Sequence, residues 1–161
     1  MSTNRYKPHL LILPEDRANA QLANGFVRET SPRYQAIQVL QEAGGWRVVL
    51  KLFEDTHVPK MRVLPERILV LVIDFDGEFP ERLRLVKEKI PPELTDRVFV
   101  LGSSGKPEDL RVRLGTYETI GSGLARDCRE QTNLIWQHPQ LQHNAVEVAR
   151  LAPRVRSFLF A

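Results

Sequence analysis

The chain has 161 residues, of which 42% are hydrophobic and 27% are charged, a composition typical of one folded domain with a hydrophobic core. Cys128 is the only cysteine, which excludes an intrachain disulfide and a cysteine-rich zinc site. No apolar run reaches the roughly 18 residues of a membrane-spanning helix, and the polar start does not resemble a secretory signal. We therefore expect a cytoplasmic protein that does not interact with membranes.

The charge is nearly balanced, with 23 basic and 20 acidic residues and a net charge of +3. This balance does not by itself indicate nucleic-acid binding. The C-terminal half is richer in arginine, for example at Arg126 and Arg129. Because the planar guanidinium group can hold a phosphate through two hydrogen bonds, these side chains are candidates for nucleic-acid contacts. A solvated arginine-rich face explains them equally well.

The first half of the chain contains short apolar runs separated by turn-forming residues. Residues 9–13 (HLLIL) predict a buried strand, and residues 15–25 predict a helix that ends at a glycine. Ser31-Pro32 is typical of a helix start and predicts a second helix that ends at Gly44-Gly45. The run WRVVLKLF at 46–53 is β-branched and apolar, which favours a second strand.

The second half begins with a polar loop at 54–66 and then the clearest strand of the sequence, RILVLVI at 67–73. A helix is expected at 80–90, where Pro91-Pro92 ends it, and a fourth strand at 97–101. The remaining elements are expected to be helices. They lie at 108–114, at 119–136 with Cys128 in the core, and at 144–160 with a break at Pro153.

Strands that are apolar throughout and alternate with helices indicate a parallel sheet covered on both faces. The sequence therefore predicts an α/β fold: one three-layer domain, 1–161, with a mainly parallel sheet of about four strands. Residues 8–114 are expected to form its α/β core and residues 115–161 a helical C-terminal extension. Ligands of such sheets bind beyond the carboxyl ends of the strands, where acidic or glycine-rich sequence follows three of the predicted strands.

Asp74 and Asp76 directly follow the buried strand at 67–73 and are the leading candidates for chemistry. Residues two apart in extended backbone share a face, so both carboxylates can point the same way. Two adjacent carboxylates repel each other unless a cation offsets them, and Mg²⁺ prefers such oxygen ligands. Glu15, at the end of the first strand, is a third candidate ligand or a general base. The alternative is a solvated turn in which Asp76-Gly77 ends the strand.

A strand ending in an acidic residue, a helix, and a later strand ending in Asp-x-Asp resembles the Toprim family of topoisomerases, primases and OLD-type nucleases. The resemblance covers roughly residues 8–114 and assigns the family's catalytic acids to Glu15, Asp74 and Asp76. It implies a Rossmann-like fold and a Mg²⁺-dependent or Mn²⁺-dependent protein that acts on phosphodiesters, such as a nuclease. Asp16 stands where the family usually has glycine, and Asn19 where a further aspartate is often found.

Two residues after the fourth strand are secondary candidates. The resemblance suggests that Glu108 helps to hold the metal, although Lys-Pro-Glu-Asp is also an ordinary helix start. Lys106 is a candidate phosphate contact, and a solvated loop lysine is the simpler explanation. The preceding glycines do not form a phosphate-binding P-loop, because Pro107 replaces the required serine or threonine.

Two other classes of protein remain open. Toprim proteins often act beside an ATPase, so the chain is alternatively a non-catalytic module that binds such a partner, with Trp136 and residues 158–160 as apolar anchors. A receiver-like phosphoacceptor is also consistent with Glu15-Asp16 and Asp74 at strand ends. The sequence lacks the regular five-unit β/α alternation expected of that class.

Overall fold

The structure is a computed structural model that describes residues 3–30 and 34–160. Four parallel strands form one sheet in the order β2-β1-β3-β4. The strands are β1 (His9–Pro14), β2 (Ile37–Val39), β3 (Arg67–Val72) and β4 (Val98–Leu101). This arrangement confirms the α/β class and the parallel sheet of four strands.

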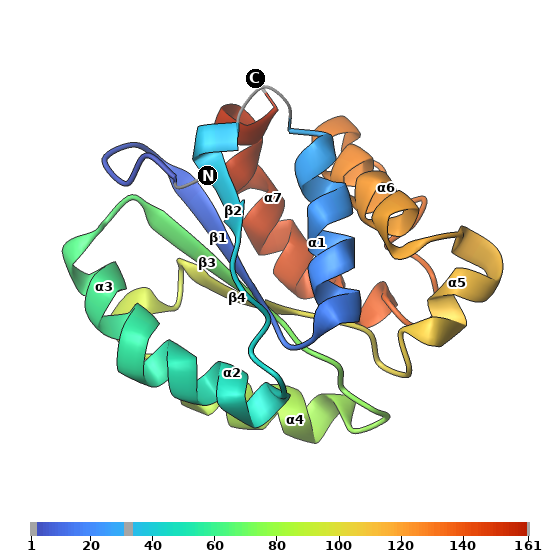
Figure 1. The fold of residues 1–161 in the computed structure, drawn as a ribbon, viewed down its shortest axis with the longest axis horizontal. Coiled ribbons are helices and arrows are strands. Elements are labelled where there is room, and N and C mark those ends of the chain that lie inside the picture. The colour runs from blue at the N-terminus through green and yellow to red at the C-terminus, as the bar shows by residue number, and fades with distance from the viewer. Residues whose placement is uncertain (1–2, 31–33, 161) are drawn as a thin grey trace.

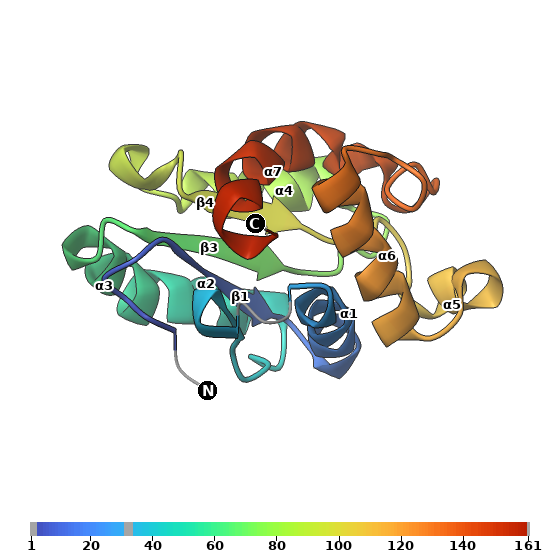
Figure 2. The ribbon, with the colours of Figure 1, turned by 90° about the horizontal axis from the view of Figure 1, so that it is seen from above.

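Helices cover both faces of the sheet (Figures 1 and 2). One face carries α1 (Arg17–Arg28), α6 (Tyr117–Glu130) and α7 (Ala145–Leu159), with α5 (Glu108–Leu114) at its edge. The other face carries α2 (Trp46–Leu52), α3 (Val58–Val63) and α4 (Phe79–Glu88). The helices that follow residue 115 thus complete one layer of the domain.

Alternate residues of the strands point to the two helical layers. On β1, Leu10 and Ile12 pack under α1 and α6, whereas Leu11 and Leu13 pack under α2 and α4, and all four are at least 95% buried. This two-sided burial explains why the strands of the sequence are apolar without interruption.

The edge strand β2 lies at Ile37–Val39, where the sequence predicts a helix. The strand predicted at 46–53 is instead the helix α2. Both predictions were wrong. Val49 of α2 and Phe53, which directly follows α2, are fully buried whereas Val48 is 40% exposed, which is the spacing of one buried helical face. The helix start expected at Ser31-Pro32 lies outside the described residues.

Two helices of the C-terminal third also differ from expectation. Helix α6 ends at Glu130 rather than at Trp136, because the buried carboxylate of Asp127 accepts hydrogen bonds from the backbone N–H groups of Leu134 and Ile135. Helix α7 runs through Pro153 without the expected break.

The free edge of β4 is covered by side chains of the α7 region. Glu147 accepts a hydrogen bond from the backbone N–H of Val100 at 2.8 Å, and Asn144 exchanges two hydrogen bonds with the backbone of Gly102. These contacts take the place of a further strand and satisfy backbone groups that would otherwise be buried without partners. The buried Glu147 is therefore structural, and the acidic residues at the carboxyl ends of the strands are a separate group.

Candidate metal centre

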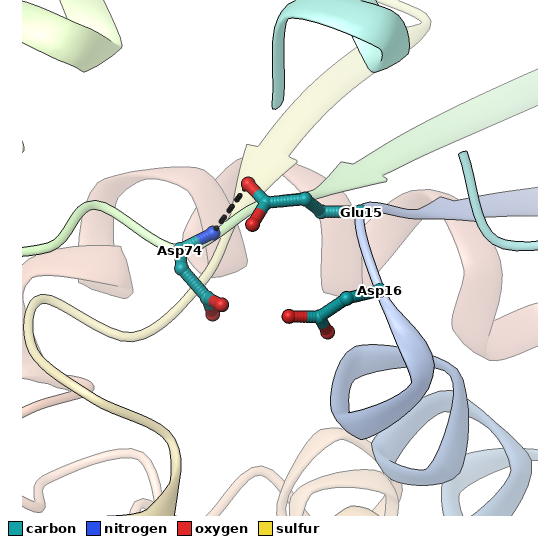
Figure 3. A group of neighbouring side chains, drawn as sticks. All are labelled: Glu15, Asp16 and Asp74. Atoms are coloured by element: carbon teal, nitrogen blue, oxygen red, sulfur yellow. Dashed lines mark hydrogen bonds between the residues drawn. The ribbon is translucent and has the colours of Figure 1, made fainter. Parts of the chain in front are cut away.

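The acidic residues meet where β1 and β3 end side by side. Pro14 pairs with Val72, and the backbone N–H of Glu15 donates to the carbonyl of Val72 at 2.8 Å, so the ladder extends to Glu15. The backbone N–H of Asp74 in turn donates to Glu15 Oε1 at 3.3 Å (Figure 3). Parallel pairing thus brings together two carboxylates that are 59 residues apart in the sequence.

Glu15, Asp16 and Asp74 form one group, which we call the acidic triad. Each offers a carboxylate oxygen, and these three oxygens all lie within 4.8 Å of one another (Figure 3). Glu15 is 9% exposed and Asp74 is 5% exposed, whereas Asp16 is only partly buried. The triad therefore lies at the surface end of a largely buried site.

Asn19 connects two members of the triad. Its Nδ2 group donates to Asp16 Oδ1 at 3.0 Å and to Asp74 Oδ1 at 3.1 Å. Asp16 also accepts a hydrogen bond from the backbone N–H of Asn19, which caps the start of α1. Asn19 is 1% exposed, and its Oδ1 atom has no hydrogen-bond partner among the described residues. One neutral amide thus orients two carboxylates without neutralising them.

The triad favours positive charge. The pKa of Asp74 is raised to about 8, mainly by burial and also by the nearby Asp16 and Glu15 carboxylates, against the lowering effect of the Asn19 hydrogen bond. Burial also raises the pKa of Glu15, partly offset by its hydrogen bond with the Asp74 backbone. Both shifts arise because the ionised carboxylates are desolvated and lack a full counter-charge, which a bound proton or cation would supply.

Asp76 lies outside the triad. The chain leaves the extended conformation at this residue, whose φ is 49°, so the side chains of Asp74 and Asp76 do not share a face. The Asp76 carboxylate instead accepts a hydrogen bond from Arg82 Nη1 at 3.0 Å and is 57% exposed.

Arg82 holds the loop that carries Asp74. Its Nη1 group donates to the Asp74 carbonyl at 2.7 Å, and its Nη2 group donates to Glu78 at 3.3 Å. The arginine is 9% exposed, and its guanidinium group also stacks over the ring of Trp46 at 4.7 Å. Its contacts explain why the loop turns sharply after Asp74.

The other predicted site residues have different surroundings. Glu108 begins α5, and Lys106 is exposed in the loop before it. Arg126 and Arg129 form ion pairs with Glu29, which follows α1 at its far end. Because α1 has 12 residues, its two ends lie roughly 18 Å apart, and Glu29 is that far from the triad.

Cys128 is buried, as expected, and burial raises the pKa of its thiol to about 11, so the thiol is protonated at neutral pH. The sequence does not reveal that Asp16, Asn19 and Arg82 all lie around Asp74. The one local signal was Asp16 at a helix N-cap position three residues before Asn19.

No family model, curated protein or solved structure matches this chain. Within residues 3–30 and 34–160, no helix is both long enough and apolar enough to span a bilayer. The fold and the triad therefore carry the functional argument.

Proposed function

We propose that this protein is a Toprim-like, Mg²⁺-dependent protein that acts on phosphodiesters, most simply as a nuclease or another nucleic-acid-processing factor. The observation that carries the proposal is the acidic triad at the carboxyl ends of parallel strands. Such strand ends are the usual ligand sites of open α/β sheets.

The donors of the triad suit Mg²⁺. They are hard carboxylate oxygens within 4.8 Å of one another. Mg²⁺ prefers hard oxygen ligands of this kind, and Glu15, Asp16 and Asp74 would hold it. The raised pKa of Asp74 is a further sign that a cation is favoured here. When bound, Mg²⁺ or Mn²⁺ would polarise a phosphate and stabilise developing negative charge.

The residues of the chain would hold the ion, orient its ligands and accept a proton. Asp74 and Asp16 would hold the ion, and Asn19 would keep both carboxylates oriented. Glu15 would act as a ligand or as the base that takes a proton from the attacking water. Asp76, once released from Arg82, would be a minor ligand that the ion does not require, and Glu108 stays a proposed accessory acid.

The test is cleavage of single-stranded and duplex DNA and RNA with Mg²⁺ or Mn²⁺. Native protein should cleave at least one substrate, and Asp74→Asn should reduce cleavage to background. Asp55→Asn is the matched control, since Asp55 is exposed and paired with Lys51 on α2. Mg²⁺ binding without cleavage of any substrate would contradict the nuclease proposal.

A receiver-like phosphoacceptor is the second candidate. It is favoured by the composition of the triad, in which two adjacent acids after β1 meet one acid after β3 and Asp76 takes no part. In this case the phosphoryl group of acetyl phosphate would pass to Asp74 with release of acetate. Intact-mass measurement of a labile phosphoryl adduct, absent from Asp74→Asn, would favour this candidate over the nuclease.

The non-catalytic module that works with an ATPase has less support. Its proposed anchors Trp136 and Leu159 are 7% and 0% exposed and belong to the core. A protein partner of this kind stays an untested prediction.

A further inference from the structure

The start of α2 is tied to the acidic triad. The backbone N–H groups of Gly44 and Gly45 donate to the carbonyl oxygen of Glu15, at 2.8 Å and 3.2 Å. Both glycines have positive φ, and α2 begins with the next residue, Trp46. In Figure 3 the teal ribbon of this segment lies directly above Glu15. Residues of the first turn of α2 are therefore neighbours of the proposed metal site.

Two arginines stack on the ring of Trp46. The guanidinium carbon of Arg82 lies 4.7 Å from the ring centroid, and that of Arg47 lies 5.0 Å from it. Arg82 is buried and already donates to the loop of Asp74. Arg47 is exposed, and its guanidinium group makes no hydrogen bond or ion pair with residues 3–30 or 34–160.

Stacking orients a guanidinium group without using its donors. The face of the group is held against the aromatic ring, while the N–H bonds lie in the plane and remain available. Trp46 thus orients Arg47 at the start of α2, and no residue of 3–30 or 34–160 occupies the hydrogen-bonding edge of the guanidinium group. Such an edge matches two oxygens of one phosphate.

A polyanionic substrate needs positive charge near the triad, because the carboxylates themselves repel phosphate. Arg126 and Arg129, which the sequence suggests for this role, are paired with Glu29 at the far end of α1. Arg47 is exposed, lies two residues after Gly45, whose backbone bonds to Glu15, and makes no ion pair within the described part of the chain.

We propose that Arg47, held by Trp46, binds a backbone phosphate of a nucleic-acid strand next to the phosphodiester at the acidic triad. The proposal rests on the function proposed above and assigns its substrate a specific contact. It places the path of the strand over the start of α2.

The experiment measures binding of fluorescently labelled oligothymidylate to the full chain in Ca²⁺, which takes similar oxygen ligands, as a function of salt. Arg47→Gln should weaken binding about tenfold at low salt. It should also reduce the slope of log affinity against log salt by about 0.7, the loss of one phosphate contact. Arg47→Lys should be intermediate. The matched control is Arg28→Gln, which removes an exposed arginine from the last turn of α1.

A second variant, Trp46→Leu, tests the stacking itself. It leaves the charge of Arg47 in place, yet it should weaken binding severalfold, and its melting temperature reports whether the fold is intact.

The role of Arg47 would be overturned if Arg47→Gln bound oligothymidylate with native affinity and a native salt slope. It would also be overturned if native protein bound Ca²⁺ but not oligothymidylate. Failure of the native protein to bind Ca²⁺ or Mg²⁺ in a titration without nucleic acid would instead refute the metal-dependent function. The two failures are therefore distinguishable.

Discussion

Three carboxyl groups share a site, and Asn19 is the one side chain among residues 3–30 and 34–160 that donates hydrogen bonds to both Asp16 and Asp74. Glu15 and Asp74 follow parallel strands, so their approach could be predicted from the sequence, since strand ends of a parallel sheet share an edge. The separation of Asp76 could not be predicted. It depends on the left-handed backbone at Asp76 and on Arg82, which lies six residues further along the chain.

Asn19→Asp should make the stability of the protein depend more strongly on bound metal than it does in native protein. The new carboxylate would lose the two hydrogen bonds that the amide donates to Asp16 and Asp74 and would repel both groups. We expect the metal-free variant to be less stable by about 1–3 kcal/mol and Mg²⁺ to restore most of this loss. Thermal unfolding in EDTA and in Mg²⁺ measures both effects. Asn24→Asp, at an exposed position of α1, is the control and should respond to Mg²⁺ as native protein does.

At the scale of elements, local patterns predicted β1, β3 and β4 but exchanged strand and helix between residues 37 and 52. The short β2 is a strand because it pairs with β1, with Ile37 opposite Leu10, and not because of a strong local preference.

The contact between α1 and α6 could not be predicted from the sequence either. It depends on glycines: a Cβ atom on Gly25 would lie 2.0 Å from Glu118 O, and one on Gly121 would lie 1.9 Å from Leu22 O.

Gly121→Ala should therefore force α1 and α6 apart. We expect a loss of about 2–3 kcal/mol in the free energy of unfolding, because a backbone carbonyl cannot move aside without moving its helix. Gly123→Ala is the matched control on the same helix. Its Cβ would meet the side chains of Ile135, at 2.8 Å, and Arg126, at 3.9 Å, and no backbone atom is among these neighbours, so the loss should be smaller. Denaturant unfolding compares the two, and an equal loss would contradict this account of the helix contact.

At the scale of the whole molecule, the free energy of unfolding depends on pH in two opposing ways, because buried histidines and the buried Asp74 titrate in opposite directions. Burial lowers the pKa values of His9, His57 and His143 below 6.5, so the folded state prefers their neutral forms. Their contribution to stability is complete above pH 6.5 and is lost as the pH falls below it. Asp74 acts in the other direction, because its pKa is raised to about 8. Its contribution is present at low pH and is lost as the pH rises toward 8.

Metal-free protein should therefore be most stable near pH 6–7, with its melting temperature lower at pH 5 and at pH 8.5. Mg²⁺ should remove the alkaline decline, because it binds the ionised triad, and should leave the acidic decline in place. His143→Phe should reduce the acidic decline, since the ring packs against Phe75 and Phe79 and phenylalanine does not titrate. Melting curves across this pH range test both limbs. An alkaline decline that persists in saturating Mg²⁺ would argue against metal binding at Asp74.

The most direct test of the central claim is calorimetric titration of Mg²⁺ and Mn²⁺ into native protein, Asp74→Asn and Asp76→Asn. The acidic triad predicts that native protein binds the ion, that Asp74→Asn does not, and that Asp76→Asn retains binding within a fewfold. No binding by native protein at millimolar metal, or equal loss in both variants, would contradict a metal centre built on Glu15, Asp16 and Asp74.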